Sequence, residues 1–262
     1  VNWDSHSMTS LKWGMKHLNM IIPEWFFITP STDRLEVRVD EKALREMRST
    51  GIPVMPMLTN NYNGEFNPNA IGRIMSNKAK RAQFVKSMLD VCKKYHFQGI
   101  NIDLEELNIN DNALLTNFVA ELYRTFHANN MYVTQDIATF NEDYDLQQLA
   151  RYNDYLFLMA YDEHNSTSAA GDVASQHWIE RATDWAAKNI PNDKLVLGLA
   201  SYGYDWAADG QCNTVSYDQA IANAYGNDSQ IYFDDDTYNL SYSYYDDDNE
   251  LHKVSFTDAV TT

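Results

Sequence analysis

Short apolar segments recur along the chain, and each is followed by a stretch with helical spacing of its apolar residues. This repetition is typical of successive βα units and predicts a parallel sheet. Six segments fit buried strands: residues 17–28, 54–60, 99–105, 132–139, 155–162 and 195–204. Four segments between them fit amphipathic helices: residues 41–49, 78–96, 112–129 and 175–188.

The pattern changes after residue 204. A helix is expected near 217–225, followed by short strands rich in Tyr and Asp over 231–256, with a hairpin among them. We expect this part to be an excursion from the main α/β architecture. A chain of 262 residues is the size of one α/β barrel, so residues 1–262 are predicted to form a single domain.

One predicted strand carries polar residues where a buried parallel strand should be apolar. In residues 99–105, Asn101, Asp103 and Glu105 alternate with Ile100, Ile102 and Leu104. Alternate residues of a strand share a face, so two carboxylates and an amide are predicted to lie in a row inside the barrel.

Two interpretations of this row are open. It could be an internal polar cluster that sets strand register. Alternatively, neighbouring groups keep one carboxyl protonated so that it acts as a general acid. The position of Glu105 at the end of its strand favours the second interpretation, because barrel active sites gather at the carboxyl ends of the strands.

Composition narrows the choice of ligand. The formal charge of −17 argues against nucleic acid or an anionic membrane surface as a partner. The chain has 17 Tyr and 6 Trp, whose rings suit stacking on sugars. It has no apolar run of membrane-spanning length, and its two cysteines imply no disulfide framework. The acidic tracts 234–236 and 246–248 lack the pattern of a calcium loop, so solvated loops are expected and no metal or cofactor is assigned.

Three motifs resemble glycoside hydrolase family 18, the chitinases and related N-acetylglucosaminidases. The segment FQGINIDLEE is similar to the family pattern DGxDxDxE at the end of the fourth barrel strand, with Gln98 and Asn101 in place of two acidic residues. FLMAYD at 157–162 resembles the sixth-strand MxYD motif, and GLASYGY at 198–204 resembles the seventh-strand GxPxYG segment.

The resemblance implies a TIM-type (β/α)8 barrel that cleaves a β-linked N-acetylglucosamine polymer by a retaining, substrate-assisted mechanism. It implies that Glu105 is the proton donor, that Asp103 orients the substrate acetamide and that the Tyr161 hydroxyl holds the acetamide oxygen. Asn101 stands where the family has an Asp that exchanges a proton with the central Asp. The expected substrate-binding residues are Glu24, Trp25, Asn60, Asp136, Met159, Asp162, Tyr204 and Trp206. Core or rim packing stays open for the two Trp residues, and a loop hydrogen bond stays open for each of Glu24, Asn60, Asp136 and Asp162 taken alone.

Other strand-end residues, Asn61, His164 and Asp205, could bond sugar hydroxyls or simply hold loops. Counting strands against the family pattern leads us to expect that the last βα unit is missing. The stretches IIPEWFF, PMLTNN and SYGYDW further resemble the family-18-like domain of bacterial fusion proteins with a polysaccharide deacetylase and a family 2 glycosyltransferase. Such a parent protein favours an extracytoplasmic or cell-envelope location.

Two other functions remain open at this stage. One is a barrel that binds sugar without cleaving it, which the altered Gln98 and Asn101 favour and the retained Glu105 disfavours. The other is a structural or partner-docking domain, which predicts no binding of sugar oligomers.

Overall fold

The computed structural model describes residues 7–107 and 112–258. The chain forms two compact units. The first unit comprises Val1–Phe157 and Asn189–Val196, and the second comprises Leu158–Lys188 and Leu197–Thr262. The expectation of a single domain over the whole chain stays a prediction.

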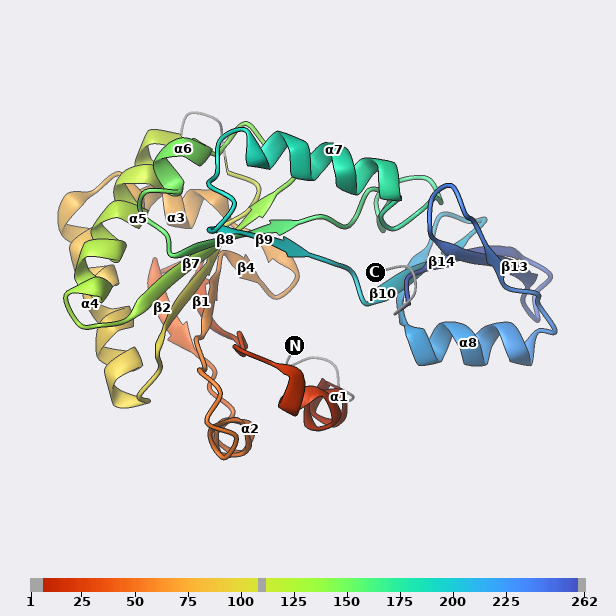
Figure 1. The fold of residues 1–262 in the computed structure, drawn as a ribbon, viewed down its shortest axis with the longest axis horizontal. Coiled ribbons are helices and arrows are strands. Elements are labelled where there is room, and N and C mark those ends of the chain that lie inside the picture. Colours follow the sequence, from red (N-terminus) through yellow and green to blue (C-terminus); the bar gives the residue numbers. More distant parts are fainter. Residues whose placement is uncertain (1–6, 108–111, 259–262) are drawn as a thin grey trace. The chain divides into compact units, whose positions relative to one another are not determined.

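The main sheet has seven strands in the order β2-β1-β3-β6-β7-β8-β9 (Figure 1). Neighbours β1 and β3, β3 and β6, and β6 and β7 are parallel, whereas β2 is antiparallel to β1. The strands are β1 (Glu24–Thr29), β2 (Arg34–Val37), β3 (Met57–Thr59), β6 (Gly99–Asp103), β7 (Tyr132–Ala138), β8 (Tyr155–Met159) and β9 (Leu195–Gly198). The predicted parallel α/β sheet is confirmed, and among the described strands β2 and β9 are its two edges.

Helices α3, α4 and α5 pack beside one another and against this sheet (Figure 1). Side-chain caps begin two of the helices: Asp40 accepts hydrogen bonds from the first backbone amides of α2, and Asn77 does the same for α4. The helices of the first unit are α1 (Ser7–Gly14), η1 (Met15–His17), α2 (Glu41–Arg48), α3 (Pro68–Met75), α4 (Lys78–Lys94), α5 (Asn112–His127) and α6 (Leu146–Leu149). The predicted helices in this part are confirmed, whereas α1, α3 and α6 were not expected.

Two predicted strands differ from the structure. The segment 17–28 becomes a strand only at Glu24, after η1 and a single bridge between Ile21 and Val54. The segment 195–204 is not one strand, because β9 ends at Gly198 and β10 (Tyr202–Ala207) belongs to a different sheet. A short hairpin, β4 (Asn61–Tyr62) and β5 (Glu65–Phe66), follows β3.

The second unit contains a five-stranded sheet in the order β11-β10-β14-β13-β12. Besides β10, the second unit contains α7 (Gln176–Ala187), β11 (Cys212–Ser216), α8 (Tyr217–Gly226), β12 (Tyr232–Phe233), β13 (Leu240–Tyr245) and β14 (Leu251–Phe256). The predicted hairpin is β13 and β14, which pair in antiparallel register.

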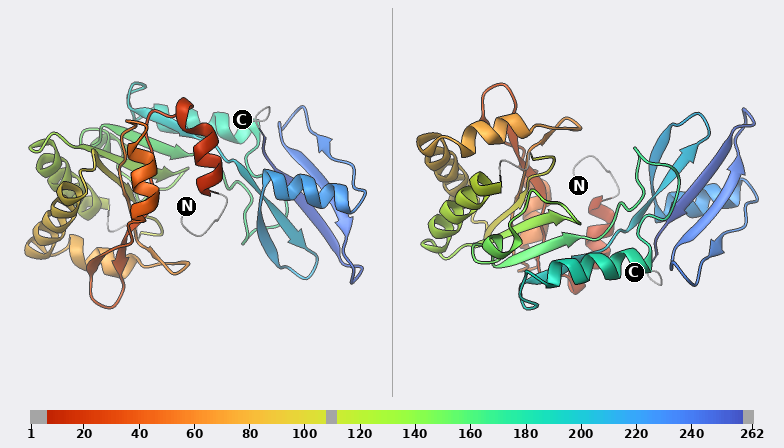
Figure 2. Two further views of the ribbon diagram at one scale, coloured as in Figure 1. Left: turned by 90° about the horizontal axis from the view of Figure 1, so that it is seen from below. Right: turned by 90° about the horizontal axis from the view of Figure 1, so that it is seen from above.

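Helix α8 lies against one face of this sheet (Figure 2). Ser216 and Gln219 form a capping box at its start, which satisfies backbone amides that the helix leaves unpaired. Its alanines 220 and 224 pack against Tyr242, Val254 and Phe256, all of them buried. The second unit therefore has its own apolar core.

Candidate active site

The carboxyl end of β6 carries the predicted polar row. One face of this segment is apolar and fully buried, as expected for the face that packs against the helices; it carries Ile100, Ile102 and Leu104. On the other side Asn101 is fully buried, whereas Asp103 and Glu105 keep partial exposure. The strand itself ends at Asp103, so Glu105 lies two residues beyond it and not at its last position.

Asn60, which directly follows β3, holds the backbone of Glu105. Its Nδ2 donates to the Glu105 carbonyl at 2.8 Å, and its Oδ1 accepts from the Glu105 amide at 2.9 Å. Asn60 is fully buried. The pair of hydrogen bonds fixes the backbone from which the Glu105 side chain projects. This is a positioning role, and it matches the loop hydrogen bond that the sequence left open for Asn60 beside a sugar contact.

Asn101 links β6 to Asp136 on β7. The Thr134 hydroxyl donates to Asn101 Oδ1 at 2.6 Å, which fixes the orientation of the amide, and Asn101 Nδ2 donates to Asp136 Oδ2 at 2.6 Å. The sequence suggested Asp103 as the partner of this amide. The structure gives Asp136 instead, because Asn101 faces the next strand of the sheet.

Two aspartates at this site have raised pKa values. Burial raises the pKa of Asp136 well above its ordinary value, the charges of Asp103 and Glu105 raise it further, and the hydrogen bond from Asn101 opposes them. Burial also raises the pKa of Asp103 to about 6, and hydrogen bonds with Thr59 and Glu105 oppose this rise. Asp103 Oδ1 is buried with no hydrogen-bond partner among the described residues.

Glu24 and Tyr144 complete the surroundings of this cluster. Burial raises the pKa of Glu24, whose charge in turn raises that of Asp103. The buried Tyr144 donates its hydroxyl proton to the Leu104 carbonyl at 3.2 Å. Burial and then the charge of Glu105 raise the Tyr144 pKa, so this phenol stays protonated. The arrangement concentrates carboxyl groups that readily hold protons near neutral pH.

Sequence reasoning missed Thr59, Thr134 and Tyr144. Thr134 could have been found, because it alternates with Asp136 along β7 and so shares its face. Tyr144 lies between β7 and α6 and carries no pattern that points to the site. The sequence left sugar stacking and core packing both open for Trp25. In the structure Trp25 is only 3% exposed and packs against Phe97 with ring centroids 6.0 Å apart, so it occupies a core position.

The second unit holds the other predicted site residues. Asp162, which has a positive φ of 65°, accepts hydrogen bonds from the Tyr202 hydroxyl at 2.5 Å and the Tyr204 hydroxyl at 2.9 Å. Burial and then the Asp162 charge raise the pKa values of both tyrosines, so both remain donors. Tyr161 is partly buried and packs edge-on against Tyr202, and Met159 is partly exposed at the end of β8.

Three further candidates serve the second unit's own structure. Trp206 is 7% exposed, and its Nε1 donates to the Asn165 carbonyl at 3.1 Å. His164 Nδ1 lies 3.0 Å from the Asp172 carbonyl oxygen. Asp205 belongs to a hydrogen-bonded network, described next.

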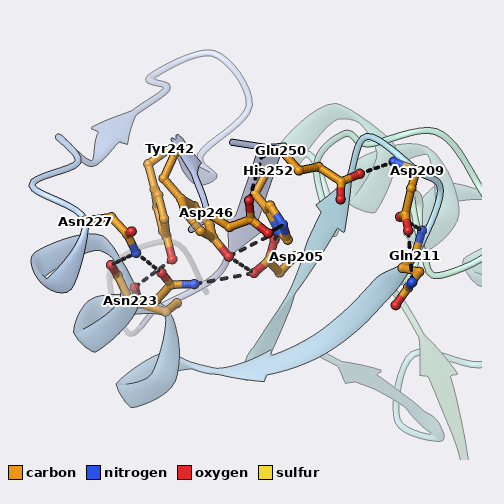
Figure 3. Close-up of polar contacts among 11 residues, drawn as sticks. Asp205, Asp209, Gln211, Asn223, Asn227, Tyr242, Asp246, Glu250 and His252 are labelled. Atoms are coloured by element: carbon orange, nitrogen blue, oxygen red, sulfur yellow. Dashed lines mark hydrogen bonds and ion pairs between the residues drawn. The ribbon is translucent and has the colours of Figure 1, made fainter. Parts of the chain in front are cut away.

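Asp205 joins three elements of the second unit (Figure 3). It accepts from the Tyr244 hydroxyl at 2.8 Å and contacts His252 Nδ1 at 2.8 Å and Asn223 Nδ2 at 3.4 Å. His252, Asp246 and Glu250 each offer one potential metal-ligand atom, and these atoms lie within 4.8 Å of one another, a spacing that a cation could bridge. Asp246 and Glu250 each accept backbone amides of the loops that they hold, so we assign this group a structural role.

The acidic tracts lie in turns. Asp234 Oδ1 accepts the backbone amides of Asp236 and Thr237, and Asp246 Oδ1 accepts those of Asp248 and Glu250. Within 7–107 and 112–258, no helix is both long and apolar enough to cross a membrane.

Comparison with known proteins identifies the family. A profile of "Glycosyl hydrolases family 18" matches residues 26–261. The uncharacterized glycosylase YvbX of Bacillus subtilis is 30% identical over 168 residues, which cover 59% of this chain and 49% of that protein. The cortical fragment-lytic enzyme of the same organism is 25% identical, over 83% of this chain and 53% of that protein. The chain thus spans about half the length of these curated relatives.

The fold is likewise that of known family structures. The crystal structure of a chitinase from Chromobacterium violaceum superimposes with a TM-score of 0.91, at 24% identity, over 99% of this chain and 85% of that one. This likeness confirms the predicted barrel-type α/β fold. The chain therefore belongs to glycosyl hydrolase family 18.

Proposed function

We propose that this chain is a glycosidase that cleaves β-linked N-acetylglucosamine-containing polysaccharide with retention of configuration. The observation that carries the proposal is the pair of carboxyl groups at the end of β6. Asp103 is largely buried, and its Oδ1 has no hydrogen-bond partner within the described parts of the chain. Glu105 lies two residues further along the chain, and Asn60 fixes its backbone. General acid catalysis requires a carboxyl group that is held in place and keeps its proton near the operating pH, and a neighbouring carboxylate favours the protonated form.

In the proposed reaction the substrate supplies its own nucleophile. Glu105 transfers its proton to the glycosidic oxygen as the bond from that oxygen to the anomeric carbon breaks. The oxygen of the 2-acetamido group attacks the anomeric carbon and forms an oxazolinium ion. Glu105, now a carboxylate, then takes a proton from water, and the hydroxide attacks the same carbon and regenerates the acetamide.

The remaining polar groups have supporting roles. Asp103 accepts a hydrogen bond from the acetamide N–H and, once ionised, stabilises the positive charge of the intermediate. The Tyr161 hydroxyl holds the acetamide oxygen. Asn101 orients Asp136, whose pKa is raised well above its ordinary value by burial and by the charge of Asp103.

We propose Glu24, Met159, Asp162 and Tyr204 as contacts to the sugar. Glu24 begins β1 and its charge acts on Asp103, Met159 ends β8, Asp162 follows that strand, and Tyr204 on β10 places its hydroxyl against Asp162. Trp25 and Asn60 are left out of this set, since one packs in the core and the other holds the backbone of Glu105.

Hydrolysis of reducing-end-labelled N-acetylglucosamine oligomers tests the proposal. We expect Glu105→Gln to lower the turnover rate by at least about 10²-fold, the size of a general acid contribution. Glu106→Gln is the matched control, because Glu106 is the exposed neighbour, and it should turn over like the parent. NMR of the first product should show the β-anomer. Equal rates in the two variants, or the α-anomer, would falsify the mechanism.

A barrel that binds sugar without cleaving it is the second candidate. It is favoured by Asn101, which cannot take up a proton from Asp103 and which is committed to Asp136 and Thr134. Calorimetric binding of the oligomers, together with no product after long incubation with the parent chain, would establish this alternative.

We also propose that the chain derives from a bacterial fusion protein with a polysaccharide deacetylase and a family 2 glycosyltransferase, and that it acts outside the cytoplasm at the cell envelope. The stretches IIPEWFF, PMLTNN and SYGYDW support this narrower assignment. Sequencing the gene on both sides of this segment tests it, and flanking domains of other kinds would refute it.

A further inference from the structure

The two faces of the five-stranded sheet differ in character. Along β13, Tyr242 and Tyr244 alternate with Ser241 and Ser243. Tyr242 packs in the core beneath α8, so the serines belong to the opposite face. On that second face the middle strands carry small polar serines, whereas Tyr204 and Trp206 of β10 pack in a small apolar cluster.

Cross-strand register places side chains of the polar face in two rows. Trp206 on β10 pairs with Lys253 on β14, which pairs with Ser243 on β13. In the second row Ser255 on β14 pairs with Ser241 on β13, and Ser241 pairs with Tyr232 on β12. Small serines therefore occupy the middle strands, and aromatic rings stand on the strands to either side.

This arrangement leaves a cavity of about 610 Å³, which we call the serine hollow; its lining includes Trp206, Tyr232, Ser241, Ser243, Lys253 and Ser255. Its volume falls in the range of roughly 300–1,000 Å³ that is typical of small-molecule sites. The hollow crosses β10, β14, β13 and β12, so it is roughly 14 Å wide at about 4.8 Å per strand spacing. Every residue that lines it belongs to the second unit.

Ser255 indicates that the hollow is built for a polar ligand. The residue is 4% exposed, and its Oγ has no hydrogen-bond partner among the described residues. A buried hydroxyl without a partner lowers stability, so such groups are normally satisfied by protein, water or ligand. Because Ser255 lines the hollow, a ligand hydroxyl seated there can supply the missing hydrogen bond.

The lining also selects the kind of ligand. Lys253 supplies a positive charge, and Asp172 and Asp228 supply negative ones, so the hollow has no single sign that would favour an ion. Serine hydroxyls both donate and accept hydrogen bonds, and the exposed ring of Tyr232 offers an apolar face. Uncharged, hydroxyl-rich sugar rings match the mixed charge of the lining, its serine hydroxyls and its aromatic face.

We propose that the serine hollow is a second saccharide-binding site, which holds sugar units of the same glycan through residues of the second unit alone. The assignment of the glycan rests on the proposed function, whereas the existence of the site rests on the hollow and on Ser255. Such a site would bind oligomers without taking part in bond cleavage.

Calorimetry on the full chain tests this proposal. In a Glu105→Gln background, which prevents cleavage, a hexamer of N-acetylglucosamine is expected to show two binding events. The double variant Ser241→Leu and Ser243→Leu places two larger side chains in the hollow, and because both positions are exposed the fold can accommodate them. We expect this variant to lose one of the two binding events or to bind the hexamer about tenfold more weakly. Thr214→Leu is the matched control, an exposed position of the same sheet on β11 outside the lining, and it should retain both.

Two further measurements keep the outcomes separate. If the double variant does not fold, the exposed Lys253→Leu replaces it, and its hexamer affinity should also fall. With Glu105 present, the filled variant should cleave a short labelled substrate at the parent rate. If the double variant folds and binds the hexamer as tightly as before, the second site is overturned. If the parent chain does not cleave the labelled substrate, the proposed function is overturned, and the binding result still stands.

Discussion

Asp103 and Asp205 are both largely withdrawn from water, yet their surroundings differ in kind. Asp205, 6% exposed in the second unit, meets Tyr244, His252 and Asn223. Asp103 has one buried oxygen, Oδ1, that no residue described in the structure partners, and burial raises its pKa to about 6. A carboxylate that serves stability is surrounded by donors, whereas one left short of donors is a candidate for chemistry. The contrast separates structural from functional carboxyl groups in one chain.

Asp103→Asn is expected to have the largest effect and tests whether Asp103 is a functional carboxyl group. We expect the cleavage rate to fall by about 10²–10³-fold, because the amide cannot stabilise the positive intermediate. Labelled oligomer hydrolysis at saturating substrate measures this. A rate within a few-fold of the parent would place Asp103 among the structural carboxyl groups.

The same variant should be more stable than the parent at neutral pH. The pKa of Asp103 rises from 3.8 to about 6 on folding, so the folded state binds a proton more tightly than the unfolded chain. Stability therefore falls as the pH rises from about 4 to about 6, and the full cost is present above that window. Urea unfolding should show Asp103→Asn about 1–2 kcal/mol more stable at pH 7.5 and equal to the parent at pH 3.5.

Asp205→Ala should give the opposite result. Its removal leaves Tyr244 and His252 without their shared acceptor, so the free energy of unfolding should fall by about 2 kcal/mol. Cleavage of a short substrate, measured below the melting temperature, should stay near the parent rate. Asp235→Ala in an exposed turn is the control and should change neither property. A stable but inactive Asp205 variant would contradict the structural role that we assign to Asp205.

Asn101→Asp gives the smallest expected effect and refines the comparison. The new carboxyl group would lie beside Asp136 and near Asp103, and its charge would raise the Asp103 pKa. Since Asp103 acts in its ionised form, the acid limb of the pH profile of kcat/KM should move to higher pH by up to about one unit. An unchanged profile would show that the identity of residue 101 does not govern the ionisation of Asp103.

Much of the fold follows from local pattern. Alternation in residues 99–105 placed Asn101, Asp103 and Glu105 on one face, and the structure bears out the burial of the three apolar residues that alternate with them. Helices α4, α5 and α8 were evident from their spacing. The strand expected over 195–204 was wrong because period-two reasoning cannot tell that β9 and β10 join different sheets. Which sheet a strand joins depends on partners far along the chain.

The site was only partly predictable for the same reason. Asn60 and Trp25 occur at strand ends or in aromatic runs that suit sugar binding, yet one binds the backbone 45 residues away and the other packs on Phe97. Neither partner is visible in the local sequence. The serine hollow was missed because it requires the register of four strands, and no single strand carries a recognisable motif.

By itself the sequence determined the residue types and their order on each strand: the carboxyl pair at the end of β6, the motif that ends in Asp162, and the alternation of serine and tyrosine in β13. Only the tertiary structure decided which of these groups are satisfied. It brought three donors to Asp205, left Asp103 Oδ1 and Ser255 Oγ without partners among the described residues, and turned Asn101 toward Asp136. The physical reason is that a pKa or a missing hydrogen bond depends on burial and on neighbours that chain folding supplies.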